Sequence, residues 1–124
     1  MITQEDLDKS ISFQQFYQLT EDLVKNKDTT GSDKSIDMVN YTKLNFARMK
    51  RILKTTPISE DVTDTVDCLS DKLTWIVLVE SWCGDAPPAV AVMNRIAELQ
   101  PAITLKIILR DDNPQLMDAF LTNG

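Results

Sequence analysis

The sequence predicts an α/β fold in which N-terminal helices are followed by a β-α-β-α unit with parallel strands. In the first half, apolar residues recur at helical spacing. In the second half, two β-rich apolar runs alternate with helical stretches, the pattern of parallel strands joined by a right-handed crossover. We therefore expect one domain over residues 1–124, with an N-terminal helical extension (1–34), further helices (35–72) and a β-α-β-α core (73–124).

The helices of the first half have recognisable starts. Ser12 with Gln15 three residues later fits a capping box, and Phe13, Phe16, Leu19 and Leu23 follow at helical spacing. A second helical stretch runs from Ser35 to about Lys54. Ser59-Glu60-Asp61 then begins a short acidic helix, because serine caps and acidic residues favour a first helical turn.

The second half contains the predicted strands. Leu73–Glu80 is almost unbroken in its apolarity, which suits a strand covered on both faces. Pro87 and Pro88 lack N–H donors, so both belong to the first turn of the following helix. Ile103–Leu109 forms the next strand, and Pro114 begins the last helix.

Composition excludes several classes of function. A net charge of −6 argues against nucleic acid or an anionic membrane surface as the main partner. No apolar run approaches the roughly 20 residues that span a bilayer. The absence of histidine excludes His-based catalysis, and two cysteines are too few for a Cys-rich zinc site. We expect no metal and no cofactor. The acidic start lacks the features of a signal peptide, so we expect the cytoplasm, where thiols stay reduced.

The most informative stretch is Trp82-Cys83-Gly84-Asp85-Ala86, directly after the first strand. We expect a helix to begin at Cys83, where unpaired N–H groups and the helix dipole stabilise a thiolate. Burial of Cys83 at the strand end and the negative charge of Asp85 oppose the formation of a thiolate. Cys83 is therefore either a nucleophilic or redox-sensing thiol or an inert, partly buried cysteine. Asp85 is either a proton acceptor or a helix-capping residue.

This order of strand, Trp-Cys-Gly and proline-started helix resembles the active-site segment of the thioredoxin superfamily. It is similar to a divergent branch in which Trp-Cys-Gly-Asp-Ala replaces the dithiol site. The resemblance implies that Cys83 is the attacking thiol, with Trp82, Gly84 and Asp85 shaping the site. Ala86 stands at the position of the resolving cysteine and cannot resolve a mixed disulfide.

The resemblance also implies a continuation that this sequence lacks. Thioredoxin-like folds add a cis-proline loop, a β-hairpin and a last helix, but no proline follows Pro114 here. We therefore expect a truncated thioredoxin-like domain with an unpaired strand edge. A second copy of the chain is expected to cover that edge in a homodimer, because an open edge favours aggregation.

Three functions follow from the resemblance. The first is monothiol disulfide reduction, thiol exchange or redox sensing through Cys83, with protein or low-molecular-weight thiols and disulfides as partners. The second is a redox-inactive interaction module that keeps the fold, which Ala86 favours. The third is iron–sulfur cluster binding, as in single-cysteine glutaredoxins, but the motif lacks the residues of that branch.

Two further features have simpler explanations. Cys68 precedes the first strand and Cys83 follows it, so seven strand residues separate them by roughly 23 Å. A disulfide needs Cα atoms within about 7 Å, so we expect Cys68 to be a small packing residue. The basic residues between Arg48 and Lys54 receive an acidic partner or form a solvated helix end.

Overall fold

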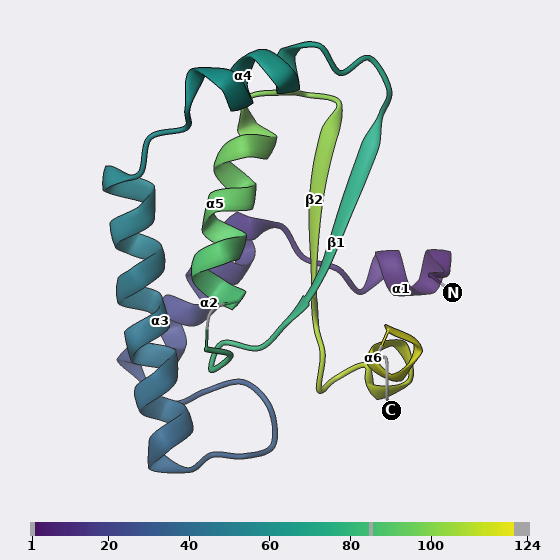
Figure 1. The fold of residues 1–124 in the computed structure, drawn as a ribbon. Coiled ribbons are helices and arrows are strands. Elements are labelled where there is room, and N and C mark those ends of the chain that lie inside the picture. Colours follow the sequence, from purple (N-terminus) through teal and green to yellow (C-terminus); the bar gives the residue numbers. More distant parts are fainter. Residues whose placement is uncertain (1, 85, 121–124) are drawn as a thin grey trace.

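The computed structural model describes residues 2–84 and 86–120. Helices come first and a strand–helix–strand–helix unit follows (Figure 1), which confirms the predicted α/β class. In chain order the elements are α1 (Gln4–Asp8), α2 (Phe13–Lys25), α3 (Ile36–Thr55), α4 (Glu60–Asp67), β1 (Leu73–Val79), α5 (Ala86–Glu98), β2 (Ile103–Leu109) and α6 (Pro114–Phe120).

Local capping explains where the helices begin. The Ser12 side chain accepts from the Gln15 N–H and the Gln15 side chain accepts from the Ser12 N–H, so the predicted capping box is present. Ser59 caps α4 as expected. Helix α1 was not singled out by the sequence. It has its own capping box, between Thr3 and Asp6.

The two strands lie side by side and parallel, with Leu73 beside Ile103 at one end of the pair. On the other edge of β2, Ile11 forms an isolated antiparallel bridge with Ile107. Its N–H donates to the Ile107 carbonyl at 2.7 Å. Among the described residues, β2 is the strand paired with β1. The homodimer through an exposed strand edge stays a prediction.

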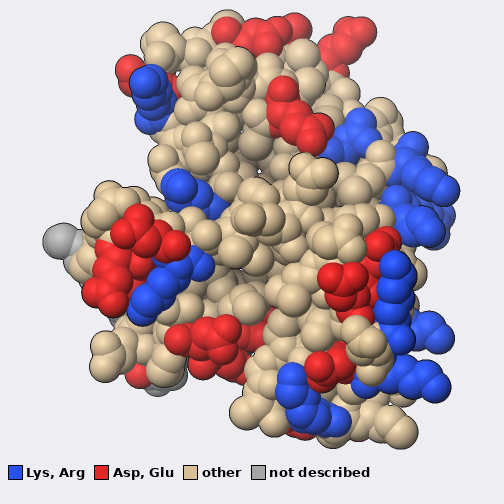
Figure 2. Space-filling model, turned by 180° about the vertical axis from the view of Figure 1, so that it is seen from behind, with Lys and Arg blue, Asp and Glu red and all other residues tan. Residues whose placement is uncertain are grey.

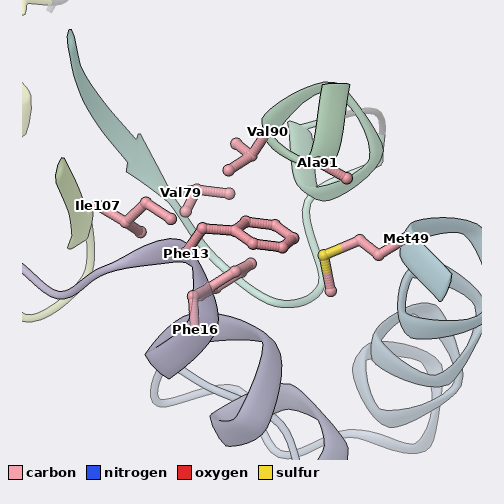
Figure 3. Packing of buried hydrophobic residues seen from close by; sticks show 7 residues of the cluster. All are labelled: Phe13, Phe16, Met49, Val79, Val90, Ala91 and Ile107. Carbon is pink, nitrogen blue, oxygen red and sulfur yellow. The ribbon is translucent and has the colours of Figure 1, made fainter. Parts of the chain in front are cut away.

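The hydrophobic core joins the N-terminal helices to the strand unit. Figure 3 shows the Phe13 ring between Val79 and Phe16, with Met49 approaching from α3. The buried cluster consists of Phe13, Phe16, Met49, Val79, Val90, Ala91 and Ile107. Because Val79 is the last residue of β1, helices α2 and α3 are fixed against the end of the strand that carries the Trp-Cys-Gly motif.

The prediction that β1 is covered on both faces is wrong for its first residues. Leu73 is 37% exposed and Thr74 is also exposed, whereas Val79 is fully buried. The reason is the position of the core, since the cluster of Phe13, Phe16 and their neighbours lies at the C-terminal end of the strand. Burial therefore increases toward the motif.

Candidate functional site

The loop after β1 differs from the prediction in one respect. Helix α5 begins at Ala86, not at Cys83. A helix beginning at Cys83 would need the Cys83 and Gly84 carbonyls to accept from the N–H groups of residues 87 and 88. Those residues are Pro87 and Pro88, which have no N–H. The prolines lie in the first turn of α5 as predicted, and their position delays the helix.

Helix α3 supplies the donors that the prolines lack. The Asn45 side-chain amide donates to the carbonyl of Ser81 at 2.9 Å and to that of Cys83 at 2.5 Å. The Arg48 guanidinium donates to the Gly84 carbonyl at 3.3 Å. Asn45 is 1% exposed, so its amide is committed to this loop. The motif is therefore held from behind by a helix more than 30 residues earlier in the chain.

Ser81 is the centre of a buried hydroxyl network that holds the same loop. Its Oγ lies 3.2 Å from the Thr29 hydroxyl, 3.0 Å from that of Thr30 and 2.9 Å from that of Thr42. The Ser81 N–H donates to Thr30 Oγ1 at 2.9 Å, and the Thr30 N–H donates to Ser81 Oγ at 3.1 Å. All four residues are buried. The segment before α3 thus forms a second wall of the site.

Cys83 lies half-buried against the hydrophobic core, at the entrance to α5. The N–H of Glu80 donates to its sulfur at 3.3 Å, and the Cys83 N–H donates to the Glu80 carbonyl at 3.2 Å. These two contacts close a tight turn between the strand end and the thiol. A backbone N–H aimed at the sulfur is a contact that a negatively charged thiolate accepts. The sulfur is therefore fixed at the end of β1 by a backbone donor.

Glu80 carries a buried carboxyl group. From the sequence, this residue was predicted only to end the first strand. It is 1% exposed, and its Oε1 accepts from the Asp111 N–H at 2.8 Å. Its Oε2 is buried and has no hydrogen-bond partner among the described residues. Burial raises the pKa of Glu80, and the charges of Asp111 and Asp112 add to this. The Thr30 hydroxyl and the Asp111 N–H act in the opposite direction but do not reverse it.

Trp82 and Asp111 both lie beside Gly31. The Arg110 guanidinium is 5.7 Å from the centre of the Trp82 ring, within cation–π range. Gly31 has a φ of +80°. A Cβ added to it would lie 2.7 Å from Asp111 Oδ2 and 3.2 Å from Trp82 Nε1. Only glycine fits this position without strain. The segment around Gly31 therefore covers the indole edge.

Trp82, Cys83 and Gly84 thus lie in the loop between β1 and α5, and Ala86 is the first residue of α5. Gly84 is exposed, and a Cβ added to it would meet no atom within 4 Å. Ala86 is half-buried against the core. Asp85 lies outside the described residues, so its two proposed roles stay predictions.

Sequence reasoning missed Asn45, Ser81 and Glu80. A signal for Asn45 existed, since this polar residue occupies the helix face that also carries Thr42 and Met49. A polar side chain on a buried face needs a partner. Its partners, however, are the backbone carbonyls of Ser81 and Cys83, which no side-chain pattern reveals.

The prediction that Cys68 packs inside is wrong. It is the exposed C-cap residue of α4, because Val66 takes the inward position of that last turn. Cys68 and Cys83 are both free thiols. In the described ranges, no group of three or more Cys, Asp or Glu side chains is placed to hold a metal ion. The helices found there are too short or too polar to cross a membrane.

Comparison with known proteins supports one family. A family model described as thioredoxin matches residues 31–124, which include α3, the loop after β1 and the strand pair. No curated protein and no solved structure matches the chain. The matched region covers well over half of the 124 residues and contains the Trp82–Ala86 motif, Asn45 and Glu80. The α/β fold and this match agree, and the chain belongs to the thioredoxin family.

Proposed function

We propose that the protein carries out monothiol disulfide exchange through Cys83. The observation that supports this most is the environment of the sulfur, which is half-buried and accepts from the Glu80 N–H, in a loop whose carbonyls are bound by α3. A thiolate held in a fixed position needs little reorganisation to attack a disulfide. Trp82, Gly84 and Ala86 shape its surroundings, and Asp85 is proposed to do so as well.

The reaction has two steps. The Cys83 thiolate attacks a disulfide R–S–S–R′, forms Cys83–S–S–R and releases R′S⁻. Because Ala86 has no sulfur, a thiol from outside the chain must attack the mixed disulfide, take R as a new disulfide and regenerate Cys83. Protein or low-molecular-weight disulfides fit the first step, and the thiol pool of a reducing compartment such as the cytoplasm supplies the second.

The test compares the two cysteines of the same molecule. Cys68 is exposed and Cys83 is half-buried, so exposure alone predicts faster alkylation of Cys68. We expect Cys83 to be alkylated faster, measured by peptide mass after a short pulse of iodoacetamide. In a Cys68→Ser background, a low-molecular-weight disulfide such as 2-hydroxyethyl disulfide should leave one adduct, and Cys83→Ser should abolish it.

A redox-inactive interaction module is the second candidate, because the same sulfur packs against the core and position 86 has no thiol. Slower alkylation of Cys83 than of Cys68, with no adduct on Cys83, would reject thiol exchange and favour this alternative. The variant Ala86→Cys separates the two further. If the loop supports exchange, the added thiol should attack the Cys83–S–S–R disulfide, form an intrachain disulfide with Cys83 and release RS⁻, so that the mixed disulfide no longer accumulates.

A further inference from the structure

Helix α3 carries a charge opposite to that of the whole chain. It has five cations and one carboxylate, Asp37, whereas the chain has a net charge of −6. All five cationic side chains are exposed. They are Lys43, Arg48, Lys50, Arg51 and Lys54. Figure 2 shows Lys and Arg side chains gathered at its right edge, the side on which α3 lies. The helix turns Asn45 and Met49 inward, so these cations face outward.

These cations are not neutralised by neighbouring carboxylates in the part of the chain that the structure describes. The ion pairs found there belong to other segments and join Lys9 to Glu5, Lys25 to Glu21, Lys34 to Asp28 and Arg110 to Asp111. Like charges on one helix face repel one another, because residues three and four apart are neighbours. An anionic partner relieves that repulsion.

Exposed apolar side chains lie among the cations. Leu44 is 45% exposed and Tyr41 is 49% exposed, and both lie on the outward side of α3 near Arg48. Spacings of three and four residues place Tyr41, Leu44 and Arg48 along one line of the helix surface. Arg48 also donates to the Gly84 carbonyl, beside Cys83. We refer to the surface formed by Tyr41, Leu44 and the five cations as the outer face of α3.

We propose that the outer face of α3 docks an acidic polypeptide segment that carries a disulfide and presents that disulfide to Cys83. This inference rests on the proposed thiol exchange and names its partner. Charge complementarity steers such a segment toward the surface, and the exposed Leu44 and Tyr41 provide contacts for its apolar side chains. A nucleic acid fits less well, because its charge continues beyond one helix and meets the acidic remainder of the chain.

The test uses synthetic peptides that each contain one cysteine as its 2-thiopyridyl mixed disulfide. In one peptide glutamates and a leucine flank the cysteine, and in the second glutamines replace the glutamates. The Cys83 thiolate displaces the thiopyridyl group, forms a Cys83–peptide disulfide and releases 2-thiopyridone, which is followed by absorbance. A Cys68→Ser background removes the exposed thiol. At low ionic strength we expect the acidic peptide to react roughly tenfold faster than the glutamine peptide.

Charge-reversed variants locate the preference. Lys43→Glu with Arg51→Glu changes the outer face of α3 and leaves Arg48 in place. Lys9→Glu with Lys25→Glu makes the same change of net charge at the C-cap of α1 and in the last turn of α2. We expect the first pair to abolish the tenfold preference, the second to retain most of it, and added salt to reduce it. A preference that is absent, or unchanged by the α3 pair, would overturn the docking proposal while leaving the thiol chemistry intact.

A binding measurement decides the proposal if neither peptide reacts. Failure with both peptides would count against the proposed function alone. The acidic peptide, with its cysteine replaced by serine and a fluorophore attached, should bind the Cys83→Ser protein in a salt-dependent manner that the α3 pair abolishes. No detectable binding, or tighter binding of a single-stranded RNA of equal charge, would reject the acidic polypeptide as the occupant.

Discussion

Asn45 offers the sharpest test of how helix α3 holds the loop of Cys83. In Asn45→Ala, the Ser81 and Cys83 carbonyls lose their side-chain donor. A buried hydrogen bond contributes about 1 kcal/mol net, so two contribute about 2 kcal/mol. Alanine is a better helix former than asparagine by up to about 0.7 kcal/mol. We therefore expect a loss of about 1.5 kcal/mol in the free energy of unfolding, measured by urea denaturation with an unchanged m-value.

The matched control lies on the same helix. Asn40 is exposed, so Asn40→Ala gains helix propensity without losing the buried contacts. The difference between the two variants should approach the full 2 kcal/mol. Asn45→Ala should also lower the ratio of Cys83 to Cys68 alkylation, which a change in stability alone does not predict. Equal stability of the two variants would refute the idea that the Asn45 amide holds this loop.

Three further predictions concern the surroundings of the loop. Burial raises the pKa of Glu80, so the wild-type protein should lose stability relative to Glu80→Gln as the pH rises from about 4.3, the ordinary glutamate pKa, to the pKa of Glu80 in the folded state. A difference in urea midpoints that does not change with pH would contradict this. In Ser81→Ala the buried Thr30 N–H loses its acceptor, which should cost about 1–3 kcal/mol in the free energy of unfolding by the same assay. Gly31→Ala should cost about 1–2 kcal/mol in the free energy of unfolding because the φ of Gly31 is +80°, whereas Gly84→Ala, with open space around it, should change stability little. Equal losses of stability in the two variants would exclude backbone strain at Gly31.

Much of the fold was predictable because its determinants are local. Ser12 and Ser59 begin helices through contacts with residues three positions later, and the two prolines fix the first turn of α5. The order of helix and strand was equally visible in the spacing of apolar residues. The first turn of α5 shows where such prediction stops. The same prolines move the helix start from Cys83 to Ala86, because they have no N–H for the Cys83 and Gly84 carbonyls, which therefore need other donors.

The sequence by itself determined the α/β class and singled out the Trp82–Ala86 motif, because both depend on residues close together in the chain. Tertiary structure decided what surrounds the motif. The Asn45 amide, the hydroxyls around Ser81 and the burial of Glu80 come from contacts between segments 30 or more residues apart. The Asn45 amide and the Glu80 carboxyl bind backbone groups, which every residue carries, and the Ser81 hydroxyl meets hydroxyls from distant segments, so no local side-chain pattern predicts these contacts. The sequence therefore identifies Cys83 as the candidate residue, and the fold fixes its surroundings.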